Sequence, residues 1–115
     1  MIQGIQHIAM IVSSVETVAF YERLGFRSVF QKNRQNDTII LLEGFGIQLE
    51  MFVDPKHPPK AQKPENLGLR HVAFKVDHLE NVMMDYDCSE IQEDWLGVRY
   101  VFTYDPDGMP VEFHE

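Results

Sequence analysis

Hydrophobic and polar positions in the first half of the chain predict a strand, a helix and three further strands. Residues 2–12 are rich in Ile and Val and apolar on both faces, which predicts an interior strand. Residues 13–24 repeat apolar side chains at helical spacing. Ser13 with Glu16 makes a capping box at the start of this helix, and Gly25 marks its stop. Three strand-like segments then follow, separated by turn residues: 26–33, 38–43 and 47–53.

The same order of patterns returns in the second half. Residues 68–76 alternate as a strand does, and Asp77 with Glu80 makes a capping box for a second helix. Residues 89–95 hold a short strand. Each half is therefore expected to contain strand, helix and three strands, a βαβββ module.

The last two strands are expected to form a hairpin. The apolar segments 98–104 and 109–113 flank Pro106-Asp107-Gly108. Pro presets φ, Asp bonds nearby backbone and Gly accepts a positive φ, so this sequence is typical of a tight turn. Alternation along the outgoing strand puts Glu112 on the face opposite to Val111.

The two halves repeat at the level of individual residues. Residues 7–12 align with residues 71–76, and residues 49–52 align with residues 111–114. Each half thereby places one His on its first strand and one Glu on its last strand. This internal repeat indicates a duplicated module.

A Pro-rich segment, residues 54–67, separates the halves. It holds four of the six prolines with lysines between them, so it predicts a linker of polyproline character. A plain connector is the simpler interpretation, and a segment that shields a pocket is the alternative. The expected organisation is one domain, 1–115, with modules 1–53 and 68–115.

Composition narrows the class of protein. The net charge of −8 argues against a nucleic-acid partner, because phosphate contacts need clustered Lys and Arg. No apolar run is long enough to cross a bilayer and no leader opens the chain, so we expect no membrane partner and a cytoplasmic location. The single cysteine, Cys88, fits a reducing compartment and is expected to be a buried, inert thiol.

The repeated His and Glu residues suggest a shared metal site. Alternation turns them away from the helix-packing face of each sheet, into an apolar trough where the two halves pair: His7, Glu50, His71 and Glu112. Two ionised carboxylates buried at close range repel each other, whereas a divalent cation balanced by two neutral imidazoles gives a neutral site. Oxygen and nitrogen ligands suit Zn, Ni, Co, Mn or Fe without distinguishing among them.

Each of these residues has a simpler interpretation when taken singly. A His on a strand is more often a hydrogen-bonded core residue than a ligand, and an inward Glu is more often exposed at an edge. Their occurrence as two matched pairs at repeat spacing favours the metal site. The remaining histidines lie outside the pairs and are expected at the surface: His57, His78 and His114.

Short motifs give the chain a family resemblance. It resembles the vicinal oxygen chelate superfamily, which includes glyoxalase I, bleomycin-resistance proteins and extradiol dioxygenases. The resemblance implies an α+β fold in which two βαβββ modules form a curved mixed sheet around a metal-centred cavity. It also implies a small-molecule substrate and a homodimer, with modules paired within a chain or across the dimer. The motifs that carry the resemblance are Gln6-His7-Ile8-Ala9, Phe20-Tyr21-Glu22-Arg23-Leu24-Gly25-Phe26, Leu49-Glu50-Met51-Phe52, Leu69-Arg70-His71-Val72-Ala73-Phe74 and Asp105-Pro106-Asp107-Gly108.

The resemblance also implies a chemistry. The set His7, Glu50, His71 and Glu112 is similar to that of glyoxalase I and related lyases and isomerases. There the metal polarises two substrate oxygens and stabilises an enediolate while a ligand Glu shuttles the proton. By position the base is Glu112 or Glu50, with Glu112 preferred, and the substrate is a small α-hydroxy- or α-keto-carbonyl compound.

Two other activities within the superfamily stay open. Extradiol dioxygenases use Fe(II) held by two His and one Glu, whereas Glu50 fills the position that they leave empty. Antibiotic-binding members generally lack the ligands and act as non-catalytic binding proteins. Glyoxalase I commonly has an Arg on the first strand that helps to hold glutathione, and this chain has Gln3 and Gln6 there. It therefore resembles the small glyoxalase-like bacterial proteins more than the glutathione-dependent enzyme.

Overall fold

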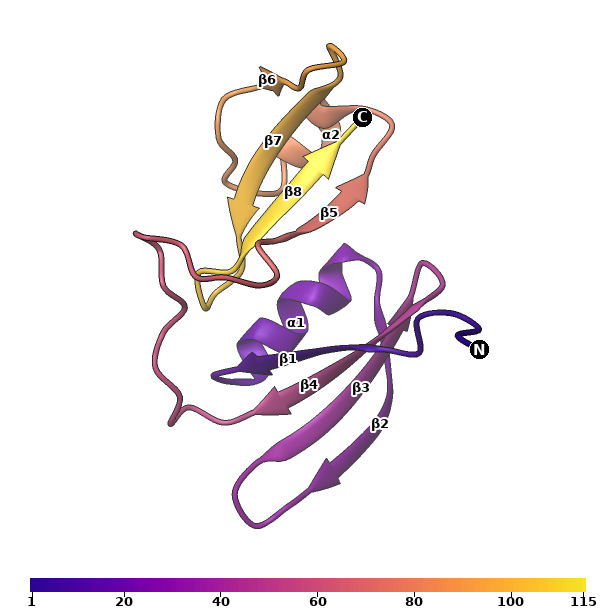
Figure 1. Ribbon diagram of the computed structural model, residues 1–115, viewed down its shortest axis with the longest axis vertical. Helices are drawn as coiled ribbons and strands as arrows, with labels where there is room; N and C mark the ends of the chain where they lie inside the picture. The colour runs from indigo at the N-terminus through magenta and orange to yellow at the C-terminus, as the bar shows by residue number, and fades with distance from the viewer. The chain divides into compact units, whose positions relative to one another are not determined.

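The computed structural model describes residues 1–115, which divide into two compact units, Met1–Pro58 and Pro59–Glu115. Each unit holds one four-stranded mixed sheet and one helix in the order βαβββ, so the predicted α+β class with two such modules is confirmed (Figure 1). Neither helix is long and apolar enough to cross a membrane. The linker bounds 54–67 and the assignment of both modules to one domain stay predictions.

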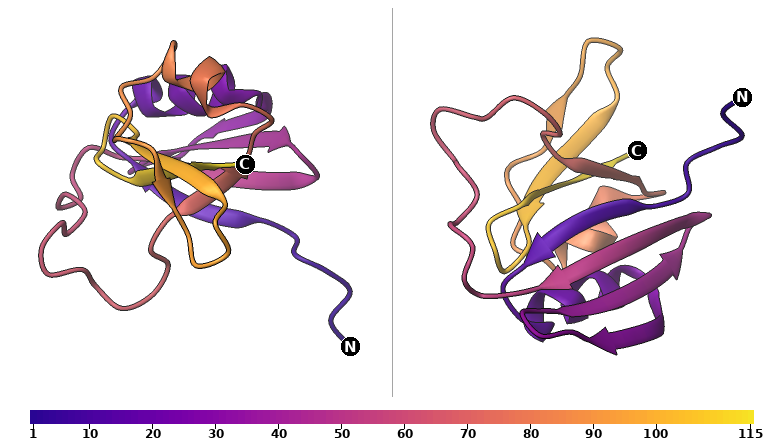
Figure 2. Two further views of the ribbon diagram at one scale, coloured as in Figure 1. Left: turned by 90° about the horizontal axis from the view of Figure 1, so that it is seen from above. Right: turned by 60° about the horizontal axis from the view of Figure 1, so that its bottom comes forward.

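The first unit is built from one helix and a sheet of order β1-β4-β3-β2. Strand β1 runs parallel to β4, and the other neighbours are antiparallel. Helix α1 lies across one face of this sheet and leaves the other face open (Figure 2). The elements are β1 (Ile8–Val12), α1 (Val15–Leu24), β2 (Arg27–Asn33), β3 (Thr38–Gly44) and β4 (Ile47–Val53).

Helix α1 begins one residue later than the capping box predicted. Its N-cap is Ser14, whose side chain accepts a hydrogen bond from the Glu16 backbone N–H, so Ser13 does not cap the helix. Gly25 ends the helix as predicted, with φ of 128°. The core of the unit is formed by one face of α1 and by alternate residues of the strands: Val12, Val18, Phe20, Tyr21, Phe26, Ile40, Leu42, Leu49 and Met51.

The prediction of an interior first strand is wrong within this unit. Strand β1 covers only Ile8–Val12, and it is an edge strand that pairs with β4 alone. Its second apolar face is not covered by the helix, and Ile11 on that face is 58% exposed. The apolar character of both faces was the basis for the prediction, but it does not distinguish a central strand from an edge strand with an open face.

The second unit repeats the topology with sheet order β5-β8-β7-β6. Its register matches that of the first unit: Ala73 is opposite Glu112 across β5 and β8, as Ala9 is opposite Glu50 across β1 and β4. The internal repeat seen in the sequence is therefore present in the strand pairing. The elements are β5 (Val72–Lys75), α2 (Leu79–Met83), β6 (Gln92–Glu93), β7 (Arg99–Tyr104) and β8 (Pro110–His114).

The turn between β7 and β8 is organised by Asp105. Its Oδ1 accepts hydrogen bonds from the backbone N–H groups of Asp107 and Met109 at 2.8 and 3.0 Å, and Gly108 takes φ of 81°. The Asp105 side chain, just before the Pro106-Asp107-Gly108 turn, therefore bonds the turn backbone. The predicted hairpin is confirmed.

Helix α2 is capped from the end of the second sheet. The predicted capping box is not formed: the Asp77 side chain accepts a hydrogen bond from the His78 N–H, and the N-cap residue is His78, which makes no side-chain cap hydrogen bond. The first helical N–H, that of Leu79, donates instead to Glu115 Oε2 at 3.0 Å. Arg99 holds the same carboxylate at 2.5 Å. This helix is only five residues long, so its place depends on this cap and on Leu79, its one fully buried side chain.

The Pro-rich segment forms no helix or strand, as predicted. Its second half is more than a connector, because six of its residues line a pocket in the second unit. The Gln62 side-chain amide donates to the Gly108 carbonyl at 2.9 Å and fastens the segment to the β7–β8 turn. The alternative interpretation, a segment that shields a pocket, therefore describes the structure better.

Candidate functional site

The first candidate pair, His7 and Glu50, lies on the open face of the first sheet. His7 directly precedes β1, and its Nε2 lies 3.1 Å from Glu50 Oε2 on the neighbouring strand β4. The side chains are 40% and 22% exposed. Leu49 and Met51, on either side of Glu50, are buried on the opposite face, so strand alternation turns Glu50 to the open side as predicted.

Both ring nitrogens of His7 face oxygen atoms. Its Nδ1 contacts Oε1 of Gln6, and its Nε2 faces the carboxylate of Glu50. An imidazole nitrogen beside a carboxylate oxygen gives a nitrogen and oxygen donor set of the kind that divalent metal ions bind. The residue types of this pair therefore fit a divalent metal ion.

The second pair, His71 and Glu112, occupies the equivalent place in the second unit. His71 directly precedes β5, and its Nε2 lies 3.0 Å from Glu112 Oε1 on β8. This pair is more buried, with Glu112 only 12% exposed. Val111 and Phe113 are buried on the opposite face, and Phe102 packs edge to face against the His71 ring at 5.0 Å.

The tautomer of His71 follows from its contact with Arg70. Its Nδ1 lies 3.3 Å from Nη1 of Arg70, and a guanidinium only donates, so Nδ1 is the acceptor and Nε2–H donates to Glu112. Metal binding through Nε2 requires the ring to move its proton and to give up the Arg70 contact. The residue types fit a metal ion, and the second pair must change its hydrogen bonds to accept one.

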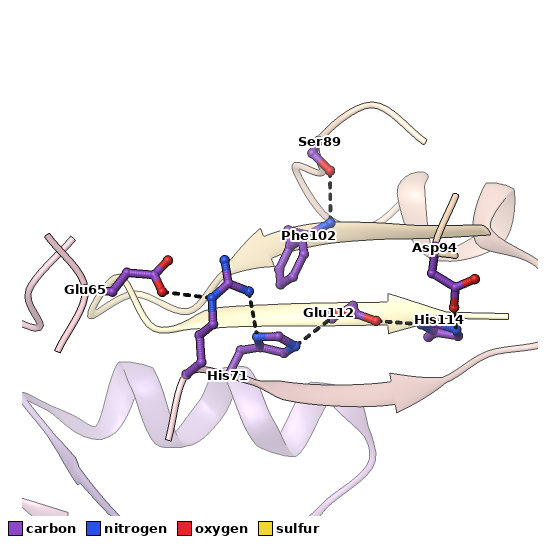
Figure 3. Close-up of polar contacts among 8 residues, drawn as sticks. Glu65, His71, Ser89, Asp94, Phe102, Glu112 and His114 are labelled. Atoms are coloured by element: carbon purple, nitrogen blue, oxygen red, sulfur yellow. Dashed lines mark hydrogen bonds and ion pairs between the residues drawn. The ribbon is translucent and has the colours of Figure 1, made fainter. Parts of the chain in front are cut away.

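His114 extends the second pair and was missed by sequence reasoning. Its Nδ1 lies 2.6 Å from Glu112 Oε2 and its Nε2 lies 3.2 Å from Asp94 Oδ2 (Figure 3). Tyr100 stacks on its ring. The prediction that His114 is a surface residue is wrong, because it is partly buried between two carboxylates. Its position two residues after Glu112, on the same strand face, was a signal that could have found it.

Asp94 is held by backbone as well as by His114. The Val98 N–H lowers the pKa of Asp94 most, and the Leu96 N–H and His114 lower it further. The result is a continuous set of polar contacts in the second unit that runs from Arg70 through His71, Glu112 and His114 to Asp94. The first unit has Phe52 where the second has His114, so this extension is specific to the second half.

The remaining predicted residues behave more simply. His57 and His78 are exposed, as predicted. Cys88 is partly buried, and burial raises the pKa of its thiol, which fits the expected inert thiol. Within the two units no group of three or more His, Cys, Asp or Glu side chains is arranged to hold a metal ion. The structure thus brings the four predicted ligands together as two pairs, one in each unit, and the shared four-ligand site stays a prediction.

Comparison with known proteins establishes the family. The model of the Glyoxalase/Bleomycin resistance protein/Dioxygenase superfamily matches residues 4–113, so the chain belongs to this superfamily and the resemblance seen in the motifs is confirmed. Among its relatives is the uncharacterized protein YwkD of Bacillus subtilis (strain 168), 32% identical over 100% of this chain and 98% of YwkD.

Two solved structures show how far the fold is shared. A glyoxalase family protein from Enterococcus faecalis is 33% identical, with a TM-score of 0.89 and coverage of 98% of both chains. A variant of the fosfomycin resistance protein FosX from Listeria monocytogenes, complexed with Mn(II) and 1S,2S-dihydroxypropylphosphonic acid, has a TM-score of 0.73. At 18% identity over 99% of this chain and 93% of that one, the likeness to FosX is one of fold.

Proposed function

We propose that the protein is a glyoxalase-like, metal-dependent lyase or isomerase that acts on a small α-hydroxy- or α-keto-carbonyl compound. The observation that carries the proposal is the pair of His–Glu contacts at 3.1 and 3.0 Å, set in the same strand register in both units. Packing of the core does not require a His–Glu pair on the open face of either sheet, so packing alone does not explain why both units have one. Binding of a shared metal ion explains both pairs.

The residues that would hold the ion are His7, Glu50, His71 and Glu112. Two carboxylates neutralise a divalent cation, and two imidazoles complete a nitrogen and oxygen donor set that suits Zn, Ni, Co, Mn or Fe. The complex of FosX with Mn(II) supports a cation of this kind on this fold. Bound there, the metal would supply Lewis acidity toward the neighbouring oxygens of the substrate.

Proton transfer falls to the carboxylates, with Glu112 as the preferred base. A lyase or isomerase of this class takes a proton from the carbon next to a carbonyl and returns a proton to the adjacent carbon. Glu112 is the more buried of the two carboxylates, and its Oε2 is held by His114 at 2.6 Å, which fixes the plane of the carboxyl group. Glu50 is the alternative base in the equivalent place.

The proposal is tested by metal analysis and an activity assay together. Protein purified without added metal is expected to contain a divalent ion and to convert the hemithioacetal of methylglyoxal. Glu112→Gln and Glu50→Gln are each expected to lower the metal content, and the variant that loses the base is expected to lower the rate by about 10²–10⁴-fold. Glu43→Gln is the matched control, because Glu43 lies across from Gln48 on the same sheet and is 51% exposed. Metal-free, inactive protein that stays inactive on adding each candidate metal would contradict the proposal.

A non-catalytic binding protein is the second candidate. It is favoured by the direct contact between Nε2 of His71 and Glu112, in which each group already satisfies the other without a metal ion. On this reading the wild-type protein binds a small molecule with no bound metal and no turnover. Glu50→Gln distinguishes an Fe(II) oxygenase from the proposed lyase or isomerase. An oxygenase site of two His and one Glu does not use Glu50, so this variant should keep its iron.

The proposal includes a homodimer or a pairing of modules within the chain. Strands β1 and β5 are both edge strands in their own sheets, and exposed Ile11 lies on β1. Open edges of this kind are usually covered in a stable protein. Light scattering of the purified protein gives its mass in solution. A monomer would contradict the homodimer and favour pairing of the two modules within one chain.

A further inference from the structure

The second unit contains a pocket of about 260 Å³ that the proposed chemistry does not use. One wall is the second half of the Pro-rich segment, and the floor comes from β7 and the start of β8. This volume is just below the range of drug-sized ligand sites, about 300–1,000 Å³, so the pocket suits a small metabolite. Its apolar lining is Ala61, Leu69, Phe102 and Pro110, with Tyr104 beside them.

The charged lining of the pocket is mainly positive. It contains Lys60, Lys63 and Arg70, and its one acidic residue is Glu65. The positive charges act on that residue: a hydrogen bond from Arg70 lowers the pKa of Glu65 most, and both lysines lower it further. In a chain with a net charge of −8, this is a local reversal of sign. Such a concave positive site attracts small anions.

The pocket wall is fixed by contacts within the unit. Gln62 bonds the Gly108 carbonyl at 2.9 Å, and Arg70 Nε bonds Glu65 Oε2 at 2.8 Å. The Arg70 guanidinium also lies 6.0 Å from the centre of the Phe102 ring. Nε is the atom that bonds Glu65, and one terminal nitrogen, Nη1, contacts His71 Nδ1. A pre-organised wall of this kind lowers the entropic cost of binding.

The pocket adjoins the second candidate pair. Phe102, part of its floor, packs against His71 with ring centres 5.0 Å apart, and Arg70 Nη1 lies 3.3 Å from His71 Nδ1 (Figure 3). We propose that this pocket binds the oxyanion group, a carboxylate or a phosphate, of a small substrate whose reacting carbonyl lies at His71 and Glu112. The reacting end rests on the proposed function, whereas anion binding in the pocket does not.

The anion site is tested by titrating the full chain with inorganic phosphate and with malonate. A chelator is present, because phosphate also binds metal ions. Chemical shifts or calorimetry are expected to show saturable binding that weakens with added salt. The double variant Lys60→Gln/Lys63→Gln is expected to weaken binding about tenfold or more, equivalent to about 1.4 kcal/mol. Lys56→Gln is the control, because Lys56 lies in the same Pro-rich segment and does not line the pocket.

The outcomes separate the pocket from the chemistry. Phosphate or malonate binding that is lost in the double variant and kept in Lys56→Gln supports the anion site. This conclusion does not depend on whether Glu112→Gln abolishes turnover. No saturable binding, or equal loss in the control, overturns the anion site. A protein that contains metal and turns over hemithioacetal while binding neither anion keeps the proposed function and loses this inference.

Discussion

Replacing His114 by Phe tests whether the polar extension of the second pair supports metal binding. Phe is the residue at the equivalent position 52 of the first unit, so the sheet accepts it at this register. The change removes the 2.6 Å contact to Glu112 Oε2 and the 3.2 Å contact to Asp94. A hydrogen bond to a charged group contributes about 1.5–3 kcal/mol, and the partial exposure of His114 places the loss of stability at the lower end.

The effect on metal affinity is expected to be at least as large as the roughly 1.4 kcal/mol that a tenfold change represents, similar in size to the effect on folding, so the two are measured separately. Residues that orient a metal ligand change affinity by about 10–100-fold when they are removed, equivalent to about 1.4–2.7 kcal/mol. With His114 gone, Glu112 Oε2 has no fixed partner, so the carboxylate can rotate away from His71. Competition between the protein and a chelator for Mn(II) or Zn(II) measures the change, and urea denaturation measures stability in parallel.

The control for this experiment is His57→Phe. His57 is exposed, lies 3.4 Å from Asp54 in the first unit, and is not one of the four proposed ligands. It should leave metal affinity unchanged. Unchanged affinity in His114→Phe, or an equal fall in both variants, would refute the orienting role of His114. Asp94→Asn, which keeps the imidazole and removes the outer charge, is expected to lie between wild type and His114→Phe.

Three further predictions concern the scaffold. Leu79→Ala is expected to destabilise the protein by about 2–5 kcal/mol in urea denaturation, because Leu79 is 0% exposed and is the one fully buried residue of α2. The Arg99 hydrogen bonds lower the pKa of Glu115 to about 2 from its usual 4.5, so the stability from this contact is complete above pH 4.5 and is lost as pH falls toward 2. Glu115→Gln should flatten that part of the stability profile, and an unchanged slope would contradict the assignment. Gly25→Ala is expected to lower the melting temperature, because φ is 128° there and a Cβ would lie 2.8 Å from Cζ of Phe45.

Much of the fold could be predicted because each element carries its own local signal. Alternation around Glu50 and Glu112 gave the correct open face, since buried neighbours flank both residues. The hairpin could be placed from its turn residues, and Gly25 gave the end of α1. Such signals depend on a few neighbouring residues in the sequence. The repeat adds support, because the same order of elements is predicted independently in each half.

The errors have a common physical origin in contacts between distant residues. The sequence pattern predicts Asp77 as the cap of α2, but Glu115, 36 residues after Leu79, provides it. A contact between residues so far apart leaves no motif near the helix. The apolar residues of β1 predict an interior strand, but the composition of a strand does not determine which strands pair with it. His114 lies next to the end of the chain, and this position favours a surface residue. Its spacing of two residues from Glu112, which puts both side chains on one strand face, is the signal for the contact between them.

The two units place the same acid at the same register, and its surroundings differ at several neighbouring positions, among them Phe52 in the first unit and His114 in the second. Glu112 is held through both of its oxygens, by His71 and by His114, whereas Glu50 contacts His7 through Oε2. A duplication alone yields interchangeable halves. Because Glu112 is held at two oxygens, the two acids are not equivalent, and Phe52→His is the first substitution with which to make the first unit resemble the second.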